Sequence, residues 1–340
     1  MAILQSELKM YRAALINDSA SNGGVMGTVE VADGVANNLF PDVSETERAA
    51  GIIRYRKGFY KVANNADLPL ASPRFFVAFQ TSGDDMVVFF AGTQTDAQGS
   101  FDPTTASSPT QYGCGQLNAN VSAGASSMVV LVEDWTNSVI FRVGDTIRIS
   151  DQPTVGGAGN EEFHTVLTVT PAGNLITLTL DGTTLANGFT ASSTKVSSVY
   201  EHGSSIVASA DAGYTVTSVS GTYNEGTYPV EGDNIGGIYD NWTILFDTPY
   251  TGAFTCTGTL TGAIGSGSIG SDFQPNNPDF GEPYFILRSA GWGGTWAAGE
   301  TLEFVTQPAA MPLWFKQVVP AAASIVSGNS FTIAVDGQTA

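Results

Sequence analysis

Six short runs of β-forming residues follow one another between residues 128 and 200, and this spacing constrains the fold more than any other feature of the chain. Val, Ile, Leu and Thr dominate the runs, and turn formers such as Gly144-Asp145 and Pro171-Ala172-Gly173-Asn174 separate them. The predicted strands are 128–133, 139–143, 146–150, 163–170, 175–180 and 194–200. Short strands at this spacing pair with antiparallel neighbours, so we expect a small antiparallel β-barrel or sandwich over residues 113–200.

The segment before it, residues 1–112, mixes signals for helices and strands. Leu4, Leu8, Tyr11 and Leu15 recur every three or four residues, which predicts a short amphipathic helix at the start. Mixed helix and strand signals predict an α+β segment, and a helix this short needs a partner surface, so we expect residues 1–112 to be a docking segment.

Further along this segment, the S-x-x-E spacing of Ser44 and Glu47 predicts a capping box and a brief helix that ends near Gly51. Extended chain should follow from 52 to 62, with the basic side chains on the face opposite Ile53 and Tyr55. The apolar runs 74–79 and 86–90 predict a hairpin, because only six residues separate them.

The last segment, residues 201–340, repeats the pattern of short strands. They are predicted at 242–246, 253–259, 284–287, 302–305, 313–318 and 331–335. Long loops rich in Gly and Pro, such as 262–281, should separate them. The sequence thus predicts a mainly β chain with three parts: an N-terminal α+β segment (1–112), a small barrel-like domain (113–200) and a C-terminal β-sandwich (201–340).

The charge of the chain limits its partners. The formal net charge is −19, and residues 1–74 are neutral, so the excess of acid lies entirely in residues 75–340. Nucleic acids and anionic membrane surfaces bind through Lys and Arg, and we expect neither as a partner. The first residues do not form a secretory signal, and the sequence has no apolar stretch long enough to span a bilayer.

Groups that could support catalysis or bind cofactors are sparse. Asp84-Asp85 and Glu161-Glu162 are adjacent pairs, and neighbouring residues of a strand point to opposite faces, so these acids are assigned to turns and strand edges. His164 and His202 are isolated, and we expect packed or surface roles for both. We predict no enzyme activity.

The sequence also gives little support for a cofactor or a metal. The Gly265–Gly270 segment matches G-x-G-x-x-G, but two prolines follow it instead of a helix, so we expect a flexible loop. Acidic loops near Asp233 and Asp240 lack the calcium-binding order of an EF-hand. Cys114 and Cys256 are far apart and are predicted to be buried free thiols.

A basic segment between residues 48 and 61 is the most distinctive charge feature. It contains Arg48, Arg54, Arg56, Lys57 and Lys61 within an otherwise acidic chain. One interpretation is a solvated strand face. The other, which we favour, is a strip that docks on an acidic patch of an identical or neighbouring subunit.

One aromatic pair has two interpretations as well. Trp292 and Trp296, spaced by Gly293-Gly294-Thr295, could stack on sugar rings of a host polysaccharide. They could equally cover the end of a sandwich or anchor an interface, and this second interpretation is favoured.

Several strings resemble structural proteins of tailed bacteriophages and Mu-like prophages. In the first segment they are Ser6–Leu8, Asn22–Met26, Val35–Val43, Glu47–Gly51 and Tyr55–Lys57. The middle strings Ser122–Ser127, Val143–Ile149 and Leu175–Leu180 are similar to small β modules of virion proteins, and Ala297–Leu302 and Pro308–Trp314 agree with the same family. These strings carry no catalytic or binding residue of that family.

The resemblance implies a non-enzymatic virion protein, assembled in the host cytoplasm, that forms a homo-oligomer in the tail, baseplate or head–tail neck. Its partners would be copies of itself and other virion proteins. The alternatives are a capsid decoration protein and a carbohydrate- or receptor-binding adhesin that uses Trp292 and Trp296.

Overall fold

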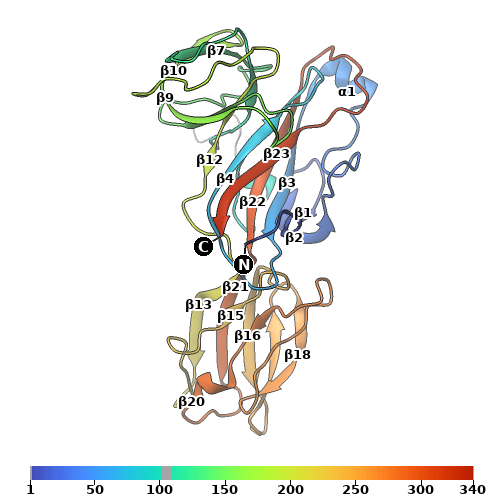
Figure 1. Ribbon diagram of the computed structural model, residues 1–340. Helices are drawn as coiled ribbons and strands as arrows, with labels where there is room; N and C mark the ends of the chain where they lie inside the picture. Colours follow the sequence, from blue (N-terminus) through green and yellow to red (C-terminus); the bar gives the residue numbers. More distant parts are fainter. Residues whose placement is uncertain (1, 102–108, 340) are drawn as a thin grey trace.

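The computed structural model describes residues 2–101 and 109–339, so residues 102–108 of the predicted first segment lie outside it. The chain is mainly β, with 45% of its residues in strands and 5% in helices. Three modules follow one another along a long axis, with a barrel at the top of Figure 1, a central module in the middle and a distal module at the bottom. None of the described helices is both long and apolar enough to cross a membrane.

The central module consists of two sheets packed face to face. One has the order β2-β1-β3-β22-β5, and the other has the order β12-β4-β23. Their strands are β1 (Leu8–Leu15), β2 (Gly23–Glu30), β3 (Ile52–Val62), β4 (Leu70–Phe79), β5 (Met86–Ala91), β12 (Tyr200–Glu201), β22 (Ala310–Val319) and β23 (Thr332–Thr339). Phe75 and Val77 of β4 meet Phe89 of β5 and Phe315 of β22 in the core between the sheets.

The end of the chain therefore belongs to the module in which the chain begins. β22 lies between β3 and β5, with Leu313 opposite Gly58 and Ala91, and all of its residues are buried. β23 pairs with β4. The predicted domain 201–340 is wrong in this respect, because its last two strands complete the sheets of residues 8–91.

Two predictions for the N-terminal part are also wrong. A 3₁₀ turn (η1, Gln5–Glu7) and strand β1 replace the predicted amphipathic helix. β1 pairs with the long strand β3, and this long-range pairing prevails over a helix that would be too short to be stable by itself. The predicted hairpin does not form either, because β4 and β5 belong to opposite sheets. The Gln80 side chain binds both the N–H and the carbonyl of Val87, at 2.8 and 2.9 Å, and so holds the crossing between them.

The predicted capping box is confirmed. Helix α1 (Glu45–Ala50) starts where the Ser44 hydroxyl accepts a hydrogen bond from the Glu47 N–H, and the Glu47 carboxylate accepts one from the Ser44 N–H at 2.8 Å.

The barrel module (114–198) confirms the predicted small antiparallel barrel, closed in the order β10-β7-β6-β11-β8-β9. Its strands are β6 (Cys114–Leu117), β7 (Ser127–Leu131), β8 (Thr146–Ser150), β9 (Glu161–Ala172), β10 (Leu175–Leu180) and β11 (Lys195–Ser198). The predicted strand 139–143 is not a strand, and its Ile140 and Phe141 fill the barrel core instead. Strand β6 takes its place.

The distal module (209–307) has a five-stranded sheet, β13-β21-β16-β17-β18, and two short ribbons, β14-β20 and β15-β19. Its strands are β13 (Ser209–Thr217), β14 (Thr222–Tyr223), β15 (Glu231–Gly232), β16 (Asp240–Phe246), β17 (Ala253–Gly258), β18 (Gly262–Ser268), β19 (Phe285–Ile286), β20 (Trp292–Gly293) and β21 (Thr301–Gln307). Its core cluster is rich in aromatic side chains, among them Trp242, Phe285 and Phe304. Two further 3₁₀ turns, η2 (Gln98–Ser100) and η3 (Ser289–Gly291), complete the described elements.

Candidate functional site

Four of the five bases of the basic segment lie on β3, the middle strand of the larger central sheet, and Arg48 lies on α1. Side chains alternate between the two faces of a strand, so Arg54 and Arg56 point to one face, and Lys57 and Lys61 to the other. The prediction that all the bases oppose Tyr55 is therefore wrong. Arg54, Arg56, Lys57 and Lys61 are 6%, 4%, 2% and 0% exposed.

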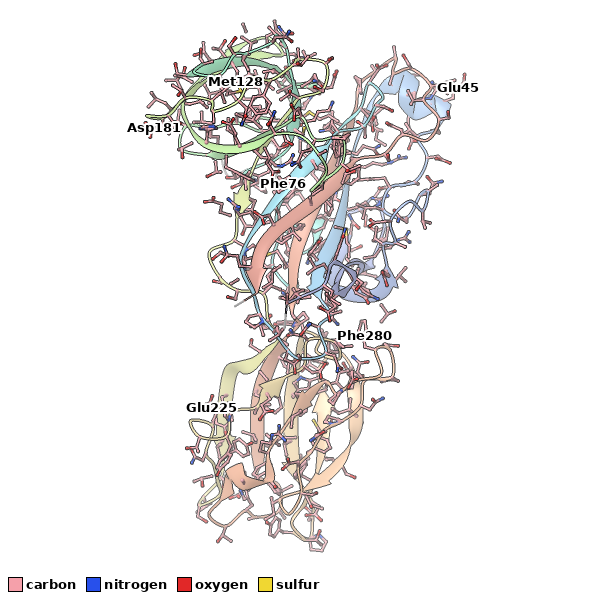
Figure 2. All side chains as sticks on the ribbon, in the orientation of Figure 1. Glu45, Phe76, Met128, Asp181, Glu225 and Phe280 are labelled. Carbon is pink, nitrogen blue, oxygen red and sulfur yellow. The ribbon has the colours of Figure 1, made fainter. Side chains whose placement is uncertain are left out.

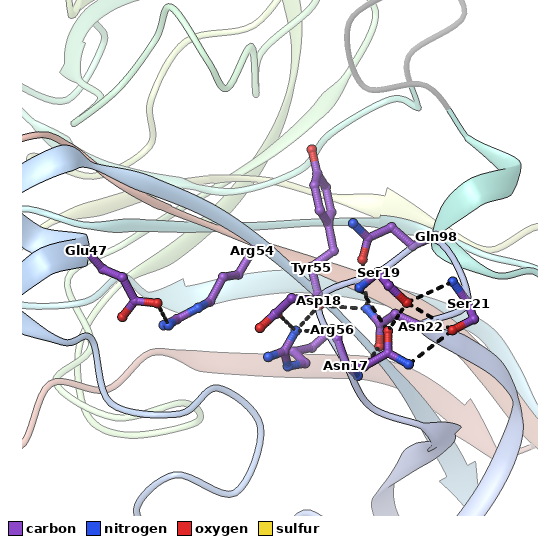
Figure 3. A network of polar contacts seen from close by, with 10 residues as sticks. All are labelled: Asn17, Asp18, Ser19, Ser21, Asn22, Glu47, Arg54, Tyr55, Arg56 and Gln98. Carbon is purple, nitrogen blue, oxygen red and sulfur yellow. Dashed lines mark hydrogen bonds and ion pairs between the residues drawn. The ribbon is translucent and has the colours of Figure 1, made fainter.

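The two arginines bind carboxylates of neighbouring segments of the same chain. Arg54 forms an ion pair with Glu47 of α1, as Figure 3 shows. Arg56 Nη1 lies 2.6 Å from Asp18 Oδ1 and also donates to the carbonyl of Asn17 at 3.1 Å. Capping hydrogen bonds from Ser44, together with the Arg54 pair, hold the pKa of Glu47 below its ordinary value. The arginines thus fasten α1 and the 17–22 loop to the sheet.

Lys57 is enclosed on the opposite face. Its Nζ lies 2.7 Å from Asp96 Oδ1 and donates to the carbonyl of Gly24 at 2.6 Å. The other carboxylate oxygen of Asp96 accepts a hydrogen bond from Trp314 Nε1 at 2.7 Å. This buried triad of Lys57, Asp96 and Trp314 joins β3 and β22 to the loop that follows β5.

Lys61 joins the central module to the distal module. Its Nζ lies 3.9 Å from the ring centre of Phe280 and 5.7 Å from that of Tyr11, and it donates to the carbonyl of Ile235. Figure 2 labels Phe280 at this junction. The amide of Asn234, next to Ile235, donates to Asp67 of the central module at 2.7 Å. A cation–π contact and hydrogen bonds therefore fix the distal module on β3.

Burial of Lys61 gives the protein a testable pH dependence. Desolvation lowers the pKa of Lys61 to about 7, against the smaller opposing effect of the Asp233 charge. Between pH 7 and 10 the unfolded chain keeps this proton and the folded chain has released it, so the free energy of unfolding should rise with pH by up to about 1.4 kcal/mol per pH unit. Urea unfolding at several pH values should show a shallower rise for Lys61→Met than for the wild type. Parallel curves for the two proteins would contradict this prediction.

The basic segment is not a free docking strip. Its four strand residues bind other parts of the same chain, and Arg48 donates to the carbonyl of Ala323 at 3.3 Å. The docking prediction is therefore corrected, because β3 is an interior strand covered on both faces. All 13 Lys and Arg residues lie in the described ranges, and each has an intramolecular partner.

The tryptophan pair belongs to the core of the distal module. Trp296 is 2% exposed and stacks on Phe246 with ring centres 4.4 Å apart. Trp292 meets it edge-on at 5.4 Å. A Cβ atom at Gly221 would lie 2.4 Å from the Trp296 ring, so that glycine is required by packing. A sugar would need an exposed indole face, and Trp296 has none.

The other candidate groups bind their own loops. Asp84 accepts the Ser324 N–H at 2.7 Å, and Asp85 binds Gln317 and Asn329. In the barrel, Glu161 pairs with Arg148, and Glu162 binds His164 Nε2 at 2.8 Å. These contacts fit the predicted roles in turns and at strand edges.

The two predicted acidic loops are held in the same way. Asp233 accepts the N–H groups of Ile235 and Gly236, and Asp240 accepts those of Leu260 and Thr261. Across the described ranges, the acidic, His and Cys side chains form no group of three suited to a metal ion.

Two further sequence predictions have clear outcomes. Cys114 and Cys256 are buried free thiols, as predicted, and burial raises the pKa of both. The glycine-rich segment 265–270 is not a loop, because its first four residues belong to strand β18, which pairs with β17 from Ala253–Ser268 to Gly258–Gly262.

Two adjoining hollows form a surface feature that no motif of the sequence predicts. A hollow of about 470 Å³ lies on β1 and β2, and an adjoining hollow of about 240 Å³ lies between β2 and the distal module. Both hollows include Met26 and Thr28. No sequence pattern indicates these hollows, because the exposure of apolar residues such as Val29 and Leu260 follows from the fold and not from periodicity.

Comparisons of this chain with models of protein families, with curated proteins and with solved structures gave no match.

Proposed function

We propose that this protein is a non-enzymatic structural protein of a tailed-bacteriophage virion and that it assembles as a homo-oligomer in the tail, the baseplate or the head–tail neck. The observation that carries the proposal is an elongated chain of three β modules with a fixed junction on each side of the central one (Figure 1). Rigid, elongated subunits suit lateral contacts between repeated copies.

Contacts of different kinds fix the two junctions. The distal module is held through Lys61 and Phe280. At the barrel, Met86 and Val88 of β5 belong to the barrel core, and the Ser197 hydroxyl donates to the carbonyl of Val77 at 2.6 Å. The Arg148 guanidinium lies 4.7 Å from the ring centre of Phe76, which Figure 2 labels below the barrel.

The two hollows contain few charged side chains. Arg12 and Asp279 are the charged residues that line them, and Arg12 already donates to the carbonyl of Asn38. The resemblance of several strings to virion proteins of tailed phages supports the location.

Two measurements test the proposal. Mass photometry should find the purified protein as a homo-oligomer, and a protein that stays monomeric at micromolar concentration would contradict this. Particles purified from the phage or prophage that encodes the chain should bind an antibody against it, and electron microscopy of gold-labelled particles should place it on the tail, the baseplate or the neck. Label spread over the head would instead indicate capsid decoration, and unlabelled particles would refute a virion role.

A further inference from the structure

Two sheet edges remain uncovered on the same side of the molecule. Within the described ranges β18 pairs only with β17, and β2 pairs only with β1 apart from its first two residues: Gly23 bridges Ala97, and the Gly24 N–H donates to the carbonyl of Asp96. In Figure 1 both strands lie on the right-hand side, β2 in the central module and β18 in the distal module. The smaller hollow lies between β2 and the turn that leads into β18, because its walls include Met26 and Thr28 of β2 as well as Leu260 and Thr261 of that turn. We call the surface formed by Ile16, β2, the 260–261 turn and β18 the edge face.

The edge face presents apolar side chains to solvent. Ile16 is 43% exposed, Val29 is 55% exposed and Leu260 is 58% exposed. Ile16 and Val29 line the larger hollow, and Leu260 lines the smaller one. Apolar side chains grouped around adjoining hollows are typical of surfaces that another protein covers.

The strands and the turn of the edge face carry very little charge, although Arg12 and Asp279 line the hollows beside them. The sequence has no charged residue between Asp247 and Asp272, an interval that includes all of β17 and β18. The one charged residue of β2 is Glu30, which lies 3.3 Å from Lys9. The rest of the surface is strongly acidic, because the net charge is −19 and six of the 13 basic side chains are buried.

The distribution of charge indicates which kind of partner would bind the edge face. Two bodies of the same sign repel each other wherever their acidic surfaces approach, and repulsion is weakest where charge is absent. A basic partner would gain nothing from an uncharged face and would bind the acidic surfaces instead. An uncharged face on an acidic body therefore favours a second copy of the same chain.

The unpaired backbone groups at the open strand edges also favour a second copy of the chain as the partner. An open strand edge has unpaired N–H and C=O groups, and proteins usually protect such edges with charged residues, proline or bulges. β18 has neither charge nor proline, and its one irregularity, opposite Cys256 and Thr257, leaves Gly265–Ser268 in regular register. An identical antiparallel strand can pair with this segment around a two-fold axis.

We propose that the edge face is the surface through which two copies of this chain associate, with the same residues buried on both copies. This inference rests on the proposed function, which includes a homo-oligomer, and it specifies the surface through which the subunits of that oligomer contact each other. Apolar burial drives the association, and charge repulsion between the acidic bodies opposes it, so added salt should strengthen it.

Charge-introducing variants test the assignment. Val29→Glu and Leu260→Glu place a carboxylate in the edge face, and each should raise the dissociation constant at least tenfold in sedimentation velocity or mass photometry. Matched controls are Ile325→Glu in the central module and Val219→Glu in the distal module, because these apolar side chains are 79% and 97% exposed outside the edge face. The controls should associate like the wild type, and circular dichroism should confirm that all four variants are folded.

The outcomes separate this inference from the proposed function. A wild-type chain that never associates would refute both. A wild-type oligomer that Val29→Glu and Leu260→Glu leave intact, or that the controls weaken equally, would refute the edge face and leave the structural role standing. Weaker association when salt rises from about 0.05 to about 0.5 M would show that ion pairs hold the copies together, which also contradicts the inference.

Discussion

Replacing Asp96 with alanine should lower the free energy of unfolding by about 3–5 kcal/mol, because the substitution leaves the Lys57 ammonium buried without its carboxylate. Lys57 is 2% exposed and its Nζ lies 2.7 Å from Asp96. Trp314 Nε1 loses its acceptor at the same time. Urea unfolding, together with hydrogen exchange of the β3 and β22 amides, would measure the loss in the central module.

Two further variants, a double variant and a control, show how much of the lost stability comes from the unpaired charge of Lys57. Lys57→Met keeps the apolar stem between Phe59 and Trp314 and removes the ammonium, so adding it to Asp96→Ala should restore most of the lost stability. Asp336→Ala is the control, because it breaks an ion pair with Arg74 in which both side chains are over one-third exposed. This control should cost about 1 kcal/mol or less.

The pH dependence of the Asp96→Ala variant gives a further check. Burial lowers the pKa of Lys57, and Asp96 opposes that shift. Without Asp96 the folded chain should release the Lys57 proton at a lower pH than the wild type, while the unfolded chain still holds it. The cost of Asp96→Ala should therefore shrink as the pH rises toward 10. A cost below about 1 kcal/mol at pH 6 would show that water reaches Lys57.

Local patterns in the sequence predicted the capping box and most of the barrel strands. The capping box at Ser44 and Glu47 needs only four consecutive residues, and α1 begins there as expected. Five of the six predicted barrel strands follow from runs of β-forming residues between turns, because this signal is local and does not depend on the partner, which for β11 is the distant β6. The exception is the 139–143 segment, whose Ile140 and Phe141 are as apolar as strand residues but fill the barrel core.

Long-range pairing could not be predicted in the same way. The apolar residues of 313–318 indicate a strand but not the strand with which it pairs. In the structure β22 pairs with β3 and β5, which precede it by more than 200 residues. The basic segment was misinterpreted for the same reason. Lys57 and Lys61 look like surface residues until β1 and β22 cover both sides of β3 and segments distant in the sequence supply Asp96 and Phe280.

The candidate surface was missed because no sequence pattern encodes it. Val29 and Leu260 form one face only after the distal module docks on the central module, and that docking depends on Lys61, Asn234 and Phe280. Glycines in β18 also concealed the strand. Gly262, the first residue of β18, has a positive φ of 80° where the chain leaves the turn. A Cβ at Gly267 would lie 2.7 Å from Phe254, so packing requires a glycine there. Both demands give the strand a composition that resembles a loop.

Because β22 and β23 complete the sheets of the central module, we expect two deletions to have opposite effects on the folding of that module. A chain that ends at Gln307 should lose the cooperative folding of the central module and aggregate, because it lacks β22, whose residues are all buried between β3 and β5. A chain in which a short Gly/Ser linker replaces 209–307 should keep that module folded, although it loses a longer piece.

The geometry of the connections explains why the longer deletion should be tolerated. Ser209 and Gln307 are partners across an antiparallel pair, so the two connections to the distal module leave the central module side by side, and a linker of a few residues can join Ala208 to Pro308. The barrel is inserted in the same way, since Cys114 pairs with Ser197. Hydrogen exchange should find protected β3 amides in the linker variant and unprotected ones in the shortened chain. The reverse result would mean that residues 201–340 fold as a separate domain and that the N-terminal sheets stand without β22.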